Sequence, residues 1–292
     1  MRGAVVGLVA IAVLALVTVA SRDRSRDSHG DAGRRGHVTS LAGVFPADPD
    51  SDRGQLATDL DRAQEIIDDP SRPRLQLANA GRFEQLATLD LARQTLRVQR
   101  ATLATLDGQT AASMRANLEA AAVLTRLVAP RRSLPHWTIV QPPAPNTLLG
   151  YFKAAQSRFG VPWEYLAAIE FIETRFGRVA GLSSAGAQGP MQFLPATWAR
   201  YGNGDIHNPD DAIHAAARYL VANGAPGEMA AALYHYNPSS DYVSAVRDYA
   251  GRMRADPRAY YGYYYWQVIY AHPGDPLVLP VGYPKVPPVP VR

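Results

Sequence analysis

Hydrophobic side chains recur at helical spacing from residue 55 to residue 129. Leu89, Leu96 and Leu103 repeat every seven residues, and a second apolar stripe follows over residues 118–128. Such stripes are typical of amphipathic helices that pack against one another. The pattern predicts a mainly α protein with an N-terminal arm of roughly two to four helices. The arm either supports the domain that follows or binds a substrate or a partner, and a leucine stripe favours support.

A shorter helix is predicted between Pro162 and Gly177, because proline suits a first helical position and glycine suits the residue just past a helix end. Its apolar positions recur at helical spacing and predict a buried stripe of Tyr165, Ile169, Ile172 and Phe176. Glu173 lies beside this stripe, three residues after Glu170. Desolvation disfavours the charged form of a carboxyl and so raises its pKa. Glu173 is therefore a candidate general acid, although periodicity alone also fits a solvated surface Glu.

The loop at residues 183–193 is not an ordinary linker. Its glycines permit close backbone approach or positive φ angles. The side-chain amide of Gln192 offers two donors and an acceptor, which suit sugar hydroxyls or N-acetyl groups. Its neighbours Met191 and Phe193 would fix the loop to the core. The pattern therefore predicts a binding loop next to the candidate acid.

These two segments together resemble the soluble lytic transglycosylase domain, a relative of goose-type lysozyme. The resemblance rests on Glu173-Thr174, on Ser183 and on a Gly-Ala-x-Gly-x-Met-Gln run that ends at Gln192. The usual Glu-Ser of the family is Glu-Thr here. Residues 189–202 are similar to the membrane-bound branch and to exported actinobacterial relatives. The resemblance implies a lysozyme-like α-helical catalytic domain over residues 148–272, with Glu173 as its catalytic residue.

The resemblance also implies residues that line a glycan cleft. Tyr236-Asn237 resembles the Ala-Tyr-Asn motif of the family, although Pro238 replaces the usual small residue. A helix-end Asn used only as a cap is the alternative. We expect Ser183, Met191, Gln192, Tyr236 and Asn237 to bind substrate.

An aromatic cluster occupies residues 260–266. Aromatic faces stack on sugar rings, and tyrosine adds a hydroxyl. The family often has a late tyrosine in its active site, which makes Tyr263 and Tyr264 candidate substrate-binding residues. Most of the cluster is expected to lie in the core.

By resemblance, Glu173 first protonates the glycosidic oxygen between N-acetylmuramic acid (MurNAc) and N-acetylglucosamine (GlcNAc). It then takes a proton from the muramic C6 hydroxyl, which attacks C1 and closes a 1,6-anhydro ring. The N-acetyl group of the substrate replaces the second carboxylate that most glycosidases use. Glu170 is the main rival for the acid, and Thr174 in the family's position favours Glu173. A hydrolytic lysozyme and a non-enzymatic wall-binding scaffold remain alternatives.

An apolar run follows Arg2 and covers residues 3–20. A run of this length can just span a bilayer as an anchor. A cleavable signal peptide instead has a shorter apolar core and ends in small residues, and residues 18–20 nearly supply such an end. We expect export to the cell envelope, with the protein membrane-anchored or secreted; a buried core helix is the alternative. Residues 21–54 are polar and rich in Gly, Asp and Arg, and they predict a disordered tether.

Two proline-rich segments flank the predicted catalytic domain. Residues 130–147 predict a semi-rigid linker. Residues 273–292 predict an extended strap or a disordered tail. The linker contains His136 and Trp137. These two side chains could bind a sugar or pack against the adjoining domain, and their position in a linker favours the domain.

The composition narrows the partners and cofactors. The formal net charge of +4 fits attraction to an anionic cell wall. No helix-turn-helix, zinc-ligand set or aromatic ribonucleoprotein motif indicates nucleic-acid binding. The lack of cysteine excludes disulfides, thiolate metal sites and a cysteine nucleophile. We expect peptidoglycan glycan strands as the partner, no nucleic acid, no cofactor, no metal and a monomer.

One further polar segment, residues 201–211, lies about where one branch of the resembling family has a calcium loop. It lacks the spacing of acidic and amide residues that such a loop requires. Within it, Asn208 and Pro209 predict the cap and first position of a helix.

Overall fold

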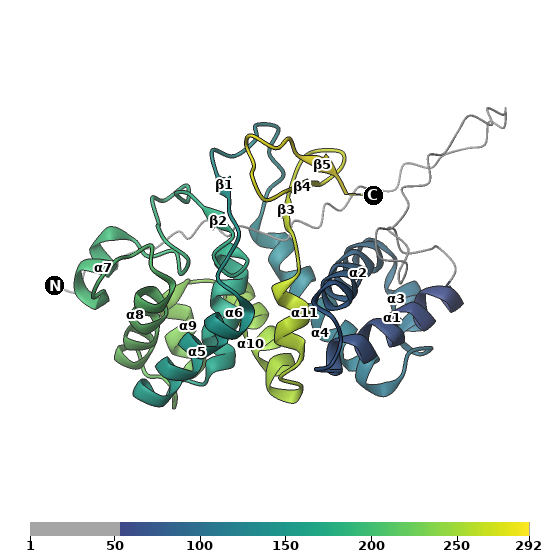
Figure 1. The fold of residues 1–292 in the computed structure, drawn as a ribbon, viewed down its shortest axis with the longest axis horizontal. Coiled ribbons are helices and arrows are strands. Elements are labelled where there is room, and N and C mark those ends of the chain that lie inside the picture. The colour runs from purple at the N-terminus through teal and green to yellow at the C-terminus, as the bar shows by residue number, and fades with distance from the viewer. Residues whose placement is uncertain (1–52, 292) are drawn as a thin grey trace.

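The computed structural model describes residues 53–291, shown as the coloured ribbon in Figure 1. The candidate signal or anchor at residues 3–20, and nearly all of the candidate tether, lie outside the described residues. Within the part of the chain that is described, no helix has both the length and the apolarity that crossing a membrane requires.

The predicted arm consists of four helices. They are α1 (Arg53–Asp68), α2 (Arg74–Arg93), α3 (Leu96–Leu103) and α4 (Gly108–Leu127). The Asp107 side chain caps α4 by accepting hydrogen bonds from two backbone N–H groups of its first turn. The seven-residue leucine repeat does not form one stripe, because Leu89 is buried in α2 whereas Leu96 begins α3 and is exposed. A turn between the two helices breaks the periodicity.

Seven helices follow the arm, and the prediction of a mainly α, lysozyme-like fold is confirmed for the described residues. They are α5 (Pro145–Phe159), α6 (Trp163–Thr174), α7 (Pro195–Tyr201), α8 (Pro209–Ala222), α9 (Met229–Tyr236), α10 (Ser240–Ala255) and α11 (Ala259–Tyr264). The predicted helix start at Asn208-Pro209 is confirmed, since the Asn208 side chain accepts from the N–H groups of Asp210 and Asp211.

Helix α6 lies at the centre of this group (Figure 1), and ten of its twelve residues are buried. The predicted stripe is buried apart from Tyr165, which is half-buried. The remaining faces of α6 are also covered, by α5 on one side and α10 on another. The second half of the helix is therefore enclosed rather than amphipathic, and its carboxyls, Glu170 and Glu173, lose their contact with water.

Five short strands form a β layer next to these helices (Figure 1). In its first sheet, β1 (Thr138–Ile139) pairs antiparallel with β2 (Val179–Ala180). The second sheet has the order β3 (Val268–Tyr270), β4 (Leu277–Leu279) and β5 (Val289–Pro290), with antiparallel pairs. Strand β1 comes from the proline-rich linker, and β4 and β5 come from the proline-rich tail. A small core of Ile139, Val179, Val268, Leu279 and Tyr283 joins the two sheets.

The arm shares its core with the catalytic helices. Leu86, Leu89 and Leu124 of the arm belong to the same buried cluster as Phe171 and Trp266. The two parts therefore pack as one body, in agreement with the supporting role that the leucine pattern favours.

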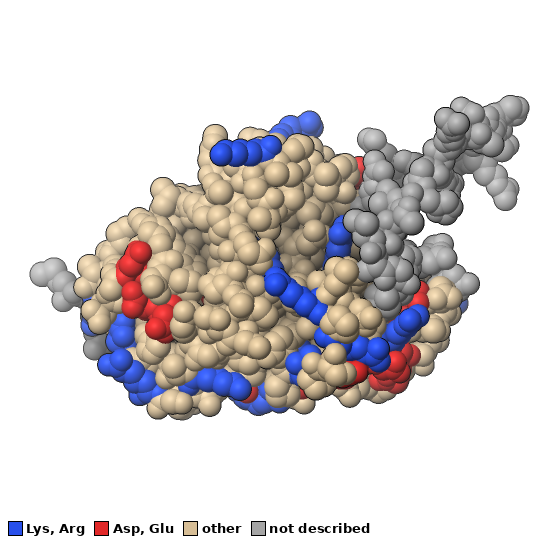
Figure 2. Space-filling model, in the orientation of Figure 1, with Lys and Arg blue, Asp and Glu red and all other residues tan. Residues whose placement is uncertain are grey.

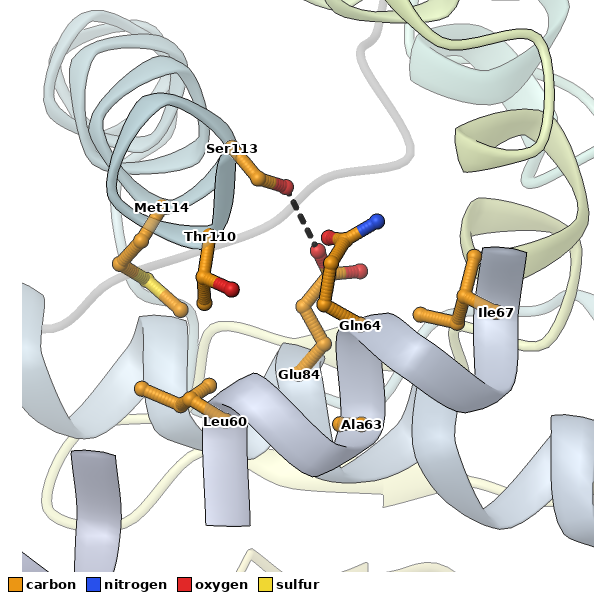
Figure 3. Close-up of a pocket in the computed structure, with 8 residues that line it drawn as sticks. All are labelled: Leu60, Ala63, Gln64, Ile67, Glu84, Thr110, Ser113 and Met114. Atoms are coloured by element: carbon orange, nitrogen blue, oxygen red, sulfur yellow. Dashed lines mark hydrogen bonds between the residues drawn. The ribbon is translucent and has the colours of Figure 1, made fainter. Parts of the chain in front are cut away.

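A buried polar network also crosses this junction. The carboxylate of Glu84 accepts hydrogen bonds from Ser113, from Asn117 and, at 3.4 Å, from the indole N–H of Trp266. Beside Glu84, the arm encloses a cavity of about 10 Å³, shown in Figure 3. A cavity of this size holds about one water molecule. Burial raises the pKa of Glu84, so the network stabilises a carboxyl that would otherwise be costly to bury.

The crossing of α2 and α11 leaves no room for a side chain at Gly81. A Cβ atom there would overlap the backbone carbonyl oxygen of Gly262. We expect Gly81→Ala to reduce the free energy of unfolding by about 1–3 kcal/mol, because backbone atoms must move apart. Gly150→Ala is the matched control, since that helical position has nothing within 4 Å and should become more stable by up to about 1 kcal/mol. Thermal or urea unfolding measures both, and equal stabilities would contradict a tight junction.

Candidate active site

Glu173 lies in the last turn of α6 and is completely buried. The Tyr242 hydroxyl of α10 donates a hydrogen bond of 2.8 Å to its Oε1 atom. Its Oε2 atom is buried and has no hydrogen-bond partner among the described residues. Burial raises the pKa of Glu173 to about 8, and the Tyr242 hydrogen bond opposes that rise. The carboxyl is thus protonated at neutral pH, as a general acid requires.

The helix ends in an unusual turn directly after Glu173. Arg175, Phe176 and Gly177 all have φ angles between 54° and 77°, so α6 stops at Thr174 rather than continuing to Phe176, the residue before the predicted end signal Gly177. The Thr174 hydroxyl accepts from the Gly177 N–H and donates a 2.6 Å hydrogen bond to the Pro190 carbonyl. Thr174 therefore joins the end of the catalytic helix to the loop that carries the other candidate residues.

The loop at residues 183–193 is held by its own hydrogen bonds. The Ser183 hydroxyl accepts from the N–H groups of Ala185 and Ala187, which stabilises the turn. Gln192 has a φ angle of 51°, and its side-chain N–H donates to the Gly189 carbonyl. These contacts give Ser183 a structural role in the loop and fix the orientation of Gln192.

Met191 and Tyr236 bring this loop to the catalytic helix. The Met191 side chain is fully buried in the main core, and its carbonyl accepts a 2.6 Å hydrogen bond from the Tyr236 hydroxyl. Burial raises the pKa of Tyr236, and the neighbouring Glu173 carboxyl raises it further. Asn237 follows as the C-cap residue of α9 and is nearly buried. The structure thus places Tyr236 beside both Glu173 and the binding loop.

Tyr263 and Tyr264 lie elsewhere. Their side chains are fully buried, and their hydroxyls donate to Asn117 of the arm and to the Pro143 carbonyl of the linker, respectively. The Tyr263 ring packs on Phe171, 5.0 Å between centroids. These contacts join α11 to the arm and the linker, and they give no support to a substrate-binding role for either tyrosine.

Sequence reasoning missed Tyr242 as a functional residue. The residue belongs to a helical apolar pattern with Val246, Tyr249 and Met253, and all of these are buried. A tyrosine in such a pattern is typical of core. Only the fold shows that one hydroxyl of this face reaches the catalytic carboxyl, from a position 69 residues further along the chain.

We expect Tyr242→Phe to lower kcat about 10- to 100-fold, because Glu173 loses the hydrogen bond that stabilises its charged form after proton donation. Tyr249→Phe is the matched control, since that buried hydroxyl on the same helix has no hydrogen-bond partner within residues 53–291. Steady-state rates of glycan cleavage measure both. Wild-type kcat in the Tyr242 variant would show that the hydrogen bond has no part in catalysis.

Comparison with known proteins finds a similarity over the part of the chain that carries this site. Residues 150–255 match the model of the transglycosylase SLT domain. The chain is 30% identical over 118 residues to the membrane-bound lytic murein transglycosylase F of Thiobacillus denitrificans, a match that covers 38% of this chain and 25% of that protein. No solved structure matches the chain. The matched residues run from within α5 to the end of α10 and include Glu173, so this region is similar to the transglycosylase SLT domain.

The match ends where α10 ends. The arm, the β layer apart from β2, and α11 with Tyr263 and Tyr264 lie outside the matched residues. The chain also spans about a quarter of the length of the curated relative that it matches. The match thus covers the residues of the site but not the elements that surround it.

Proposed function

We propose that the protein is a peptidoglycan lytic transglycosylase, which cleaves the MurNAc–GlcNAc β-1,4 bond and leaves 1,6-anhydro-MurNAc ends. The observation that carries this proposal is the buried Glu173 carboxyl of a transglycosylase SLT domain, protonated at neutral pH and hydrogen-bonded by Tyr242. The name of the relative supports the same chemistry.

In the first step Glu173 gives its proton to the glycosidic oxygen. Its Oε2 atom, which has no hydrogen-bond partner among the described residues, is the atom for this transfer, while Oε1 accepts from Tyr242. The Tyr242 hydrogen bond stabilises the carboxylate that forms. In the second step the carboxylate takes the proton of the muramic C6 hydroxyl, which attacks C1 and closes the anhydro ring.

The arrangement of carboxyls supports a mechanism with one protein carboxylate. A classical glycosidase needs a second carboxylate on the other side of the sugar ring. Glu170 is on the same helix as Glu173 and cannot face it across a sugar. Asp205 and Asp210 lie outside the core, where they contact His207 and His214. We therefore assign the role of the nucleophile to the N-acetyl group of the substrate. The hydrolytic alternative uses the same Glu173 with water.

We propose that Gln192 and Asn237 hold the N-acetyl sugars, and that Ser183, Met191 and Tyr236 shape the cleft. The support is the hydrogen bond of Tyr236 to the Met191 carbonyl, which fixes the loop against the catalytic helix. On the face shown in Figure 2, Lys and Arg side chains are spread over several regions rather than gathered in one patch. Such dispersed positive charge fits a modest attraction to an anionic wall polymer.

We further propose that the protein acts in the cell envelope after export, as a monomer. The apolar run at residues 3–20 and the membrane-bound relative support this location. The dispersed charge also gives nucleic acid no patch on that face, in line with a glycan partner.

Replacing Glu173 tests the proposed function directly. We expect Glu173→Gln to lower cleavage of purified peptidoglycan about 10²- to 10⁴-fold, because the amide cannot donate the required proton. Glu228→Gln, an exposed position in the same domain, is the control and should keep wild-type activity. Mass spectrometry of the digest should show muropeptides with 1,6-anhydro ends. Reducing ends would indicate a lysozyme, and binding without any product would indicate a scaffold.

The pH dependence follows from the same carboxyl. The pKa of Glu173 is raised to about 8, and the protonated form is the active one in the first step. We expect cleavage to fall as the pH rises through about 8, whereas an unperturbed Glu with a pKa of about 4.3 would already be ionised at pH 6. Initial rates between pH 5 and pH 10 measure this. An alkaline fall centred near pH 5 would exclude Glu173 as the buried acid.

A further inference from the structure

The binding loop, residues 183–193, is held differently at its two ends. Near its C-terminal end, the hydroxyls of Thr174 and Tyr236 donate hydrogen bonds of 2.6 Å to two loop carbonyls. Its N-terminal end instead crosses the surface over residues 180–182, which are all exposed. Exposed backbone with few packed neighbours opens readily. A loop that keeps one position therefore needs a contact at this end as well.

The indole of Trp137 makes that contact. Its N–H donates a hydrogen bond of 3.3 Å to the Leu182 carbonyl. The ring also lies against Gly181, where a Cβ atom would lie 2.8 Å from the Cδ1 atom of Trp137. The three atoms nearest to that Cβ position all belong to Trp137 and His136. The linker thus contacts the chain directly before Ser183, the first residue of the binding loop.

Trp137 is itself fixed to the β layer. It precedes β1, which lies side by side with β2 (Figure 1). On the other edge of β1, the Ile139 N–H donates to the Tyr283 carbonyl at 3.1 Å, and the Ile139 carbonyl accepts from the Gly282 N–H at 2.8 Å. The Trp137 ring packs edge-to-face on Tyr270 of β3, with 5.9 Å between the centroids. The ring is therefore held by the linker and the tail.

Core packing explains only part of this arrangement. The small core between the two sheets consists of five other residues, and Trp137 lies half-buried at its edge. A phenylalanine would pack on Tyr270 and fill most of the same space. It would lack the N–H group that reaches the Leu182 carbonyl. A donor directed at the backbone beside a binding loop indicates a role in holding that loop.

We propose that Trp137 is a positioning residue, which holds residues 181–182 and thereby keeps the binding loop in the orientation that presents Gln192 to the glycan. This inference rests on the proposed function. It adds to the cleft a part that comes from outside the residues that match the family model. Glu173 and its donor Tyr242 lie paired in the core. Loss of the indole N–H therefore weakens binding of the glycan and leaves the proton transfer intact.

Amide hydrogen exchange tests the positioning without any glycan. The buried N–H of Ala187 donates to the Ser183 hydroxyl, so its exchange rate reports the order of the binding loop. We expect this amide to exchange about 3- to 10-fold faster in Trp137→Phe, because one hydrogen bond is lost at the exposed end of the loop. Tyr270→Phe is the matched control, since it removes a hydroxyl from the same β layer but keeps the ring beside Trp137. It should keep the wild-type rate.

Two outcomes of the exchange experiment would overturn the proposal. One is an unchanged rate at Ala187 in Trp137→Phe. The other is an equal acceleration of the amides of α8 in the same variant, because the ring would then be a core residue whose loss loosens the whole domain.

Steady-state kinetics on soluble glycan strands measures the consequence for the reaction. We expect Trp137→Phe to raise KM about 3- to 10-fold and to keep kcat within about twofold of wild type, because the change removes binding and not acid catalysis. An unchanged KM, or a loss confined to kcat, would contradict a role in binding. Faster exchange at Ala187 combined with a wild type that makes no glycan product would overturn the proposed function, while the contact between Trp137 and the loop would stand.

Discussion

The exclusion of water from α6 is the constraint on which the rest of the site depends. A carboxyl on a solvated helix would be ionised at neutral pH and could not serve as an acid. Helices α5 and α10 pack around α6, and its last turn closes against the loop through Thr174. This enclosure raises the proton affinity of Glu173. The hydrogen bond from the Tyr242 hydroxyl opposes that rise, because it stabilises the ionised carboxylate. The raised pKa of Glu173 thus depends on packing more than on the number of polar groups around it.

Helix α10 connects that chemistry to the arm. Near its start Tyr242 contacts the catalytic carboxyl, and near its end Arg252 forms an ion pair with Asp256 and donates to Gln64 of α1. Between these points α10 packs along α4. The arm therefore supports α10, and α10 in turn covers α6. A change at the arm that moved α10 would also move the donor to Glu173.

The sequence was informative where local chemistry decides the structure. Asn208-Pro209 caps α8 as predicted, and α6 begins one residue after Pro162. The sequence was less informative where tertiary contacts determine the local conformation. Arg175 and Phe176 adopt left-handed backbone, which no propensity favours, because the Thr174 side chain and the loop hold that turn. Tyr242 and Tyr263 both look like core tyrosines in the sequence, and only the fold shows that the first hydroxyl reaches Glu173 and the second reaches Asn117.

The core that joins the arm, α11 and the catalytic helices has a consequence for what can be separated from this chain. The family match ends at residue 255, but Trp266 and Leu124 pack in the same cluster as Phe171. Strand β2, inside the match, pairs with β1 outside it. A fragment cut at the family boundaries would expose apolar surface and an unpaired strand edge, both of which favour aggregation. The segment that matches the family model is thus smaller than the segment that shares one core.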